Sequence, residues 1–207
     1  MLYLMLQKSE PGCPTGELDA ILYDQFYADP RAVEYGRFPW YSNAVRMRPH
    51  EKFPAGLVLI GKSSNYKFAA RSIARDLYVV SSGFLEVCKE LDVKLGDAVE
   101  IDVRNASGEI VVDEKYFLVT FESYLAKDVV LPESKITEGQ YGRIEAFTSL
   151  VIDVQRVSHV FRVLGLSARF STLFCSGAFK EKAERAELKG IEFIPLLGSC
   201  SDDVVAL

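Results

Sequence analysis

Hydrophobic positions follow the same plan in two parts of the chain, residues 77–103 and residues 173–196. In the first part a short apolar run ends at Ser81, and apolar side chains then recur at helical spacing before a glycine and an alternating segment. In the second part Ser176 and Gly190 hold the corresponding places. Because serine often begins a helix and glycine often ends one, the pattern predicts two similar strand–helix–strand units. Each unit carries an apolar helix stripe that must pack on a sheet.

Between these two parts the sequence predicts strands. Short apolar or alternating runs are separated by turn-forming residues, and the runs are residues 110–112, 116–121, 129–131, 144–147, 150–152 and 160–163. Their spacing allows both parallel and antiparallel pairing. The expected fold class is α+β, with a strand-rich mixed sheet on which the helices of the two units pack.

The first 75 residues differ from the rest in their many turn formers. An opening strand is expected at residues 3–6, after which prolines and glycines interrupt every periodic run. Trp40 and Tyr41 lie in a proline-bounded segment, where they could fill a small core or anchor a partner. We expect residues 1–75 to form short strands and loops, in what could be a small subdomain, and residues 76–207 to form the main α+β domain.

Composition is typical of a globular protein. Of the 207 residues, 49% are hydrophobic and 26% are charged, which suits one or two buried cores. No apolar stretch approaches the roughly 20 residues of a membrane-spanning helix. The opening residues lack the basic flank and the length of a signal peptide. We therefore expect a cytoplasmic protein with no membrane contact.

The net charge of −5 is unevenly distributed. Residues 1–75 hold ten Lys or Arg and seven Asp or Glu, a balance of +3, whereas residues 76–207 hold fourteen and twenty-two, a balance of −8. An acidic region repels phosphate backbones, so nucleic acid is not an expected partner. The acidic region would suit a basic protein partner, or it could serve only to keep the protein soluble.

Metal and nucleotide sites are not supported by the sequence. Residues 56–63 match the phosphate-loop pattern, but the four residues between the two glycines themselves read as a strand and leave no compact loop. The two histidines are far apart in sequence, and the cysteines are scattered and fit structural thiols better than a disulfide framework. The cysteines are Cys13, Cys88, Cys175 and Cys200. No cofactor or metal is expected.

Catalytic residues are not predicted either. Ser81 and Ser176 each stand where a strand meets a helix, and helix capping explains both. His159 is isolated, and such a histidine is more often a hydrogen-bonded structural residue than a catalytic base. Two alternatives stay open: a small hydrolase that uses Ser176 or His159, and a module that binds a small ligand or regulates another protein.

Several segments carry a family likeness. They are residues 159–166 (His-Val-Phe-Arg-Val-Leu-Gly-Leu), 172–176 (Thr-Leu-Phe-Cys-Ser) and 188–193 (Leu-Lys-Gly-Ile-Glu-Phe), with further similarity at residues 115–119 and 131–134. Together with the strand–serine–helix units, they make residues 77–196 resemble the eleventh immunity-protein family of bacterial polymorphic-toxin and type VI secretion systems. Residues 13–54 contribute nothing to this resemblance.

The resemblance implies an antidote that is not an enzyme. Such a protein would bind a cognate effector toxin in the cytoplasm and neutralise it. A nuclease toxin would be basic because it must meet phosphates, and an acidic inhibitor would compete for the same surface. The candidate contacts with the toxin are exposed acids near the end of the first unit and two possible aromatic anchors, namely Glu100, Asp102, Glu109, Asp113, Glu114, Trp40 and Tyr41.

Overall fold

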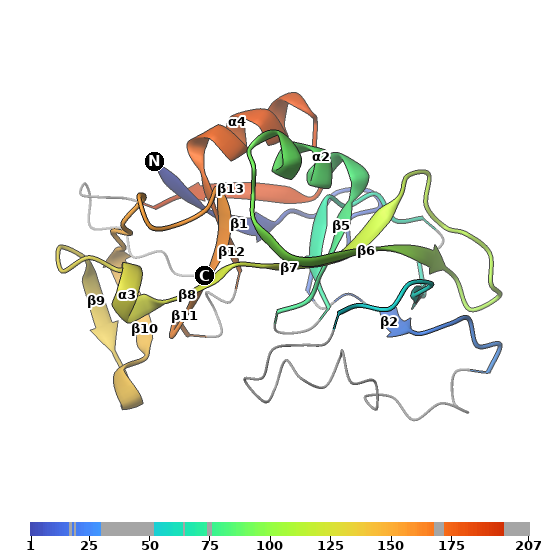
Figure 1. The fold of residues 1–207 in the computed structure, drawn as a ribbon, viewed down its shortest axis with the longest axis horizontal. Helices are drawn as coiled ribbons and strands as arrows, with labels where there is room; N and C mark the ends of the chain where they lie inside the picture. Colours follow the sequence, from blue (N-terminus) through green and yellow to red (C-terminus); the bar gives the residue numbers. More distant parts are fainter. Residues whose placement is uncertain are drawn as a thin grey trace.

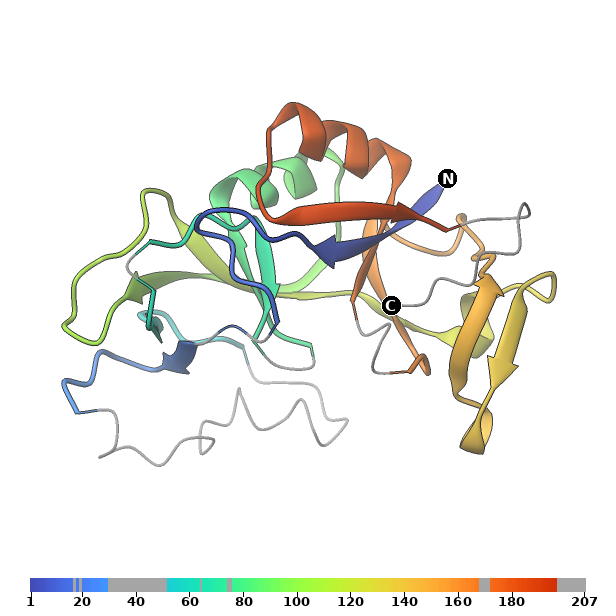
Figure 2. The same ribbon diagram turned by 180° about the vertical axis from the view of Figure 1, so that it is seen from behind.

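The structure of the protein is a computed structural model, and it describes residues 1–16, 18, 20–29, 52–63, 65–73, 76–167 and 172–196. Strands dominate this part of the chain, with mixed sheets and a few short helices. The strand-rich α+β class is as predicted. Helices α2 (Ser82–Glu90) and α4 (Gly177–Arg185) lie side by side over the two larger sheets (Figures 1 and 2).

The larger sheet has six strands in the order β2-β3-β6-β7-β5-β4. These strands are β2 (Ala20–Tyr23), β3 (Val58–Gly61), β4 (Ala70–Ser72), β5 (Tyr78–Ser81), β6 (Leu95–Arg104) and β7 (Tyr116–Phe121). β3 runs parallel to β6, and the other neighbouring pairs are antiparallel. The face of the sheet away from the helices covers a core that includes Leu59, Phe68 and Tyr116.

The second sheet has five strands in the order β13-β1-β12-β11-β8. Its strands are β1 (Leu2–Gln7), β8 (Ser123–Leu125), β11 (Val160–Leu164), β12 (Leu173–Ser176) and β13 (Ile191–Pro195). β1 lies between β12 and β13 and is antiparallel to both, so that Leu4 is opposite Phe174 and Ile194. The chain passes from the first sheet to the second at Glu122, between β7 and β8.

A two-stranded hairpin packs on the second sheet. It consists of β9 (Lys135–Glu138) and β10 (Ile144–Ser149), with a 3-10 turn at Gln140–Gly142 and a short helix α3 (Ala126–Val129) before it. Phe147 of the hairpin is buried in one core with Phe161 and Phe174 of the sheet. The hairpin therefore has a fixed base at one end of the molecule (Figure 1).

Serine caps begin both nine-residue helices. The Ser81 hydroxyl accepts the N–H of Phe84 at 3.3 Å, and the Ser176 hydroxyl accepts the N–H of Phe179 at 3.2 Å. Helix α2 connects β5 to β6, which flank β7, and helix α4 connects β12 to β13, which flank β1. The rings of Phe84 and Phe179 meet with centroids 5.1 Å apart, in a core shared by both helices and both sheets.

Several of the predicted strands are present. The opening strand is confirmed within β1, and residues 116–121, 144–147 and 160–163 lie in β7, β10 and β11. The predictions for residues 110–112, 129–131 and 150–152 are wrong, since those segments form only isolated bridges or end a helix. The division at residue 75 stays a prediction, but β1 and β3 of the first segment pair with strands of the second.

Candidate functional site

The five predicted acids lie at one end of the six-stranded sheet. Two are exposed side chains of β6, and the other three lie in the connection from β6 to β7, the last two of them just before β7. All five side chains are exposed, and together they define what we call the β6–β7 surface: Glu100, Asp102, Glu109, Asp113 and Glu114. The five acids thus lie on one strand and the connection that follows it, within fifteen positions of the sequence.

Each of these acids has a partner within the chain. Glu109 accepts a hydrogen bond from the Asn105 amide at 2.8 Å, and Glu114 accepts one from the Ser82 hydroxyl at 3.1 Å. The other three form ion pairs, Lys115–Glu100 at 2.9 Å, Arg104–Asp102 at 2.8 Å and Lys67–Asp113 at 3.1 Å. Five acids and three bases leave the surface with a charge of −2. Exposed ion pairs of this kind add little stability, so the acids are free to exchange partners.

Exposed apolar side chains accompany the acids. Ile110 is 63% exposed, and Phe26 is 36% exposed and packs against Gly108, where an added Cβ would lie 3.0 Å from the ring. The sequence did not indicate that Ile110 is exposed, because residues 110–112 were predicted to form a strand. Trp40 and Tyr41, the predicted aromatic anchors, lie outside the described residues.

A groove of about 740 Å³ lies beside the start of α4. It brings together His159 and Ser176, whose Nδ1 and Oγ atoms are 2.7 Å apart. The carboxylates of Asp92, Glu122 and Glu181 also line it. A serine next to a histidine is the beginning of a nucleophile–base pair, so this groove is where the hydrolase alternative has to be judged.

The geometry of this pair fits helix capping better than catalysis. The Ser176 hydroxyl already accepts the N–H of Phe179, which engages its oxygen at the start of α4. Among the described residues, Ser176 is the side chain that hydrogen-bonds the His159 ring, and no carboxylate orients the other ring nitrogen. A catalytic triad needs such a carboxylate as its third group. The pair therefore joins β11 to the helix start.

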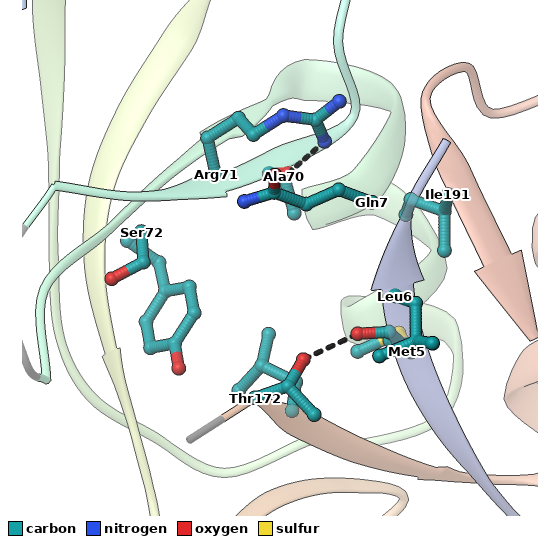
Figure 3. A pocket seen from close by; sticks show the side chains of 10 residues that line it. Met5, Leu6, Gln7, Ala70, Arg71, Ser72, Thr172 and Ile191 are labelled. Carbon is teal, nitrogen blue, oxygen red and sulfur yellow. Dashed lines mark hydrogen bonds between the residues drawn. The ribbon is translucent and has the colours of Figure 1, made fainter. Parts of the chain in front are cut away.

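A smaller cavity of about 330 Å³ lies between β1, β4 and β12. Figure 3 shows Ser72 on one side and Met5 and Leu6 of β1 on the other, with the Thr172 hydroxyl donating to the Met5 carbonyl oxygen. Burial raises the pKa of the Tyr78 hydroxyl, which also lines the cavity, so this group stays neutral. Apolar walls with a few neutral polar groups suit a small uncharged molecule.

Arg71 lines the same cavity but is held by the protein itself. Its guanidinium donates to the carbonyl oxygens of Pro14 at 2.6 Å, Ala70 at 2.7 Å and Gly190 at 3.0 Å. It also lies over the Phe68 ring, 5.5 Å from the centroid. Burial lowers the pKa of Arg71. These contacts tie β4 to two distant loops, which is a structural role.

Metal and nucleotide chemistry find no support in the described part of the chain. Within it, no three His, Cys, Asp or Glu side chains are placed to hold a metal ion. Cys13, Cys88 and Cys175 are buried free thiols, and burial raises the pKa of each. Residues 58–61 of the phosphate-loop pattern form the buried strand β3, as predicted. None of the described helices has the length and apolar character to cross a membrane.

The comparisons with known proteins agree with the sequence resemblance. No curated protein matches the chain. A sequence model of the immunity protein family (Imm11) matches residues 19–197, which is most of the chain and includes every strand from β2 to β13. The chain therefore belongs to the Imm11 immunity protein family.

Proposed function

We propose that this protein is a cytoplasmic immunity protein that binds a cognate secreted toxin and neutralises it. Membership of the immunity protein family carries the proposal. The side-chain geometry is in accord with it, because Ser176, the serine that contacts His159, caps a helix. The protein would act by occupying a surface of the toxin, without turnover.

The β6–β7 surface is the proposed contact for a basic toxin, such as a nuclease of a polymorphic-toxin or type VI secretion system. Its acids outnumber its bases, and complementary charge raises the association rate. Ile110 and Phe26 would add apolar contact area, since a few desolvated side chains usually supply most of the binding free energy. In this arrangement Glu109 and Asp113 lie beside the apolar contact.

The two strand–helix–strand segments would serve as the framework of this surface. In both, a serine caps the helix and the two strands flank a third strand, which supports reading them as similar units. Helix α2 begins at Ser82, whose hydroxyl bonds Glu114 of the β6–β7 surface. The framework would thus hold the acids in place without taking part in any chemistry.

The test uses the C-terminal domain of the protein encoded by the reading frame immediately upstream, which the proposal expects to be a secreted toxin, made as an inactive variant. We expect the two proteins to co-purify and the immunity protein to restore growth of cells that express the active domain. The double variant Glu109→Lys/Asp113→Lys should bind several-fold more slowly at low salt, and the difference should shrink as salt screens the charges.

The matched control is Glu133→Lys, combined with a second reversal at Glu86, because both side chains are exposed and lie outside the β6–β7 surface. This control changes the net charge by the same amount. Equal slowing by the two double variants would show that only net charge matters, and would remove the β6–β7 surface as the contact. Failure of the unaltered protein to bind the domain would contradict the proposed function itself.

A second candidate, a module that binds a small ligand, is favoured by the 330 Å³ cavity. It predicts that an uncharged molecule filling this cavity raises the melting temperature, and that Thr172→Phe, which fills the space, abolishes the effect. A screen of small neutral compounds by thermal shift would measure it. If no compound raises the melting temperature, this cavity offers no alternative to the toxin-binding proposal.

A further inference from the structure

The turn between β9 and β10 has an unusual backbone. Tyr141 has φ 64° and ψ 28°, and the next residue, Gly142, has φ 69°. Glycine adopts this left-handed region freely, but a residue with a Cβ is disfavoured there. Asn-Gly is the favoured pair where two successive residues are left-handed, as in the type I′ turn. A tyrosine at this position therefore needs an explanation.

The other described residues with a side chain and a positive φ have a local explanation. Asp92 (φ 50°) and Glu187 (φ 52°) each follow the C-cap residue of a nine-residue helix. Their successors donate back to the helix, Val93 to the Cys88 carbonyl at 2.9 Å and Leu188 to the Ala183 carbonyl at 3.0 Å. Helices commonly end with such a left-handed residue. Tyr141 does not follow a helix of this kind, because it lies in the turn between β9 and β10.

Contacts within the protein do not compensate for the conformation of Tyr141. Its side chain is 94% exposed, the largest exposure among the described large hydrophobic residues. A buried tyrosine would gain from packing and from a hydrogen bond for its hydroxyl. Here the ring is exposed to solvent, so no packing within the chain offsets the free-energy cost of the left-handed backbone. We therefore look for the compensating contact in a binding partner.

The base of the turn is held firmly. The N–H of Gly139 donates to the Arg143 carbonyl at 2.8 Å, and the Arg143 Nε donates to the Leu166 carbonyl at 2.9 Å. Ile144 is 3% exposed, and its N–H donates to the Gly165 carbonyl at 2.9 Å. The ring is thus presented on a rigid support, which lowers the entropy lost on binding.

We propose that the tip of the β9–β10 hairpin inserts Tyr141 into a pocket of the toxin, as a second docking element; this rests on the function proposed above. The pocket would have apolar walls for the ring and basic residues at its rim. The exposed Glu138 and Glu145 flank the turn, and the exposed Arg143 is tied by its Nε to the Leu166 carbonyl, so the acids outnumber the bases at the turn. Exposed acids around an aromatic side chain fit such a rim.

The hairpin tip is separate from the β6–β7 surface. The hairpin lies at one end of the long axis of the molecule, and the connection from β6 to β7 lies toward the other (Figure 1). A toxin that contacts both must extend along the immunity protein. Because the two contacts share no residues, losses of affinity from changes at each should combine independently.

The experiment replaces Tyr141 and reads stability and binding together. Tyr141→Asn supplies the favoured Asn-Gly pair and removes the ring, so we expect the melting temperature to rise by about 2 °C. The same variant should bind the inactive toxin domain at least about tenfold more weakly, mainly through faster dissociation. Tyr141→Phe keeps the ring and should retain most of the affinity. Val154→Asn, at another exposed apolar position, should leave binding unchanged.

The outcomes separate this inference from the proposed function. If the unaltered protein binds and Tyr141→Asn binds equally well, the hairpin tip is not a docking element, although the proposed function stands. If binding weakens but the melting temperature falls, the variant has damaged the hairpin and the argument from backbone conformation is wrong. If the unaltered protein does not bind the domain, both proposals fail. A higher melting temperature together with weaker binding supports the hairpin tip as a docking element.

Discussion

At the scale of single residues, two serines carry similar roles with one difference. Ser81 and Ser176 both cap a helix, but only Ser176 is also hydrogen-bonded to a histidine. Sequence alone identified both caps, because the signal lies within three residues of the serine. It could not identify the contact with His159, which depends on the pairing of β11 with β12.

Alanine at these two positions should separate capping from the histidine contact. Ser81→Ala should lower the free energy of unfolding by about 1 kcal/mol, through loss of the cap. Ser176→Ala should lower it by about 2 kcal/mol, since it also removes a hydrogen bond worth about 1 kcal/mol. Urea unfolding of both variants, with His159→Ala to complete a double-mutant cycle, measures the difference.

Toxin neutralisation should persist in Ser176→Ala. If the unaltered protein turned over a substrate and this variant did not, the hydrolase alternative would be supported.

At the scale of helices and strands, α2 and α4 close the central core from one side. The rings of Phe84 and Phe179 are fully buried where the two helices meet. Each helix is short, and a short helix is not stable by itself in water. Its stability comes from this packing, which also joins the two sheets beneath.

Truncation of one of these rings should therefore be severe. Phe179→Ala should lower the free energy of unfolding by about 3–5 kcal/mol, because it leaves a cavity that the surrounding residues cannot fill. Phe179→Leu keeps most of the volume and should lower it by about 1.5 kcal/mol or less. Phe26→Ala, at a partly exposed ring, is the control and should change it by less than about 1 kcal/mol. Similar losses for Phe179→Ala and Phe26→Ala would mean that the helices do not form the centre of the fold.

Some of these helices and strands could be predicted from the sequence, and others could not. The helices and β7 were predicted because their patterns are local and strongly periodic. Residues 110–112 were wrongly predicted as a strand, because an apolar run can also lie in an extended connection with Ile110 exposed. The hairpin tip was missed because nothing in the sequence around Tyr141 indicates a left-handed backbone at a tyrosine. The acids of the candidate site stay a prediction. The partner of Asp113, Lys67, could not be identified from the sequence because the two positions are far apart, whereas Arg104 lies two positions from Asp102 on β6.

At the scale of the whole molecule, distant parts of the chain depend on one another. β1 is enclosed by β12 and β13, and β3 pairs with β6. Glu122 links the two sheets through one continuous stretch, from β7 to β8.

Division of the chain at residue 75 tests this dependence. The fragment of residues 76–207 lacks β1 to β4, so the five-stranded sheet loses a strand between two others and should not form. We expect the fragment to show no cooperative thermal transition by circular dichroism, and addition of residues 1–75 to restore at least part of it. A fragment that unfolds cooperatively by itself would establish residues 76–207 as an independent domain.

The position of β1 also bears on how the protein is made. Strand β1, at Leu2–Gln7, has both of its neighbours only after Ile191–Pro195 has been translated. Pairing across so many residues is slow, and the waiting strand exposes an unpaired edge. A chain interrupted before that point would therefore lack a complete five-stranded sheet, so this half of the molecule would finish folding only after the segment has been synthesised.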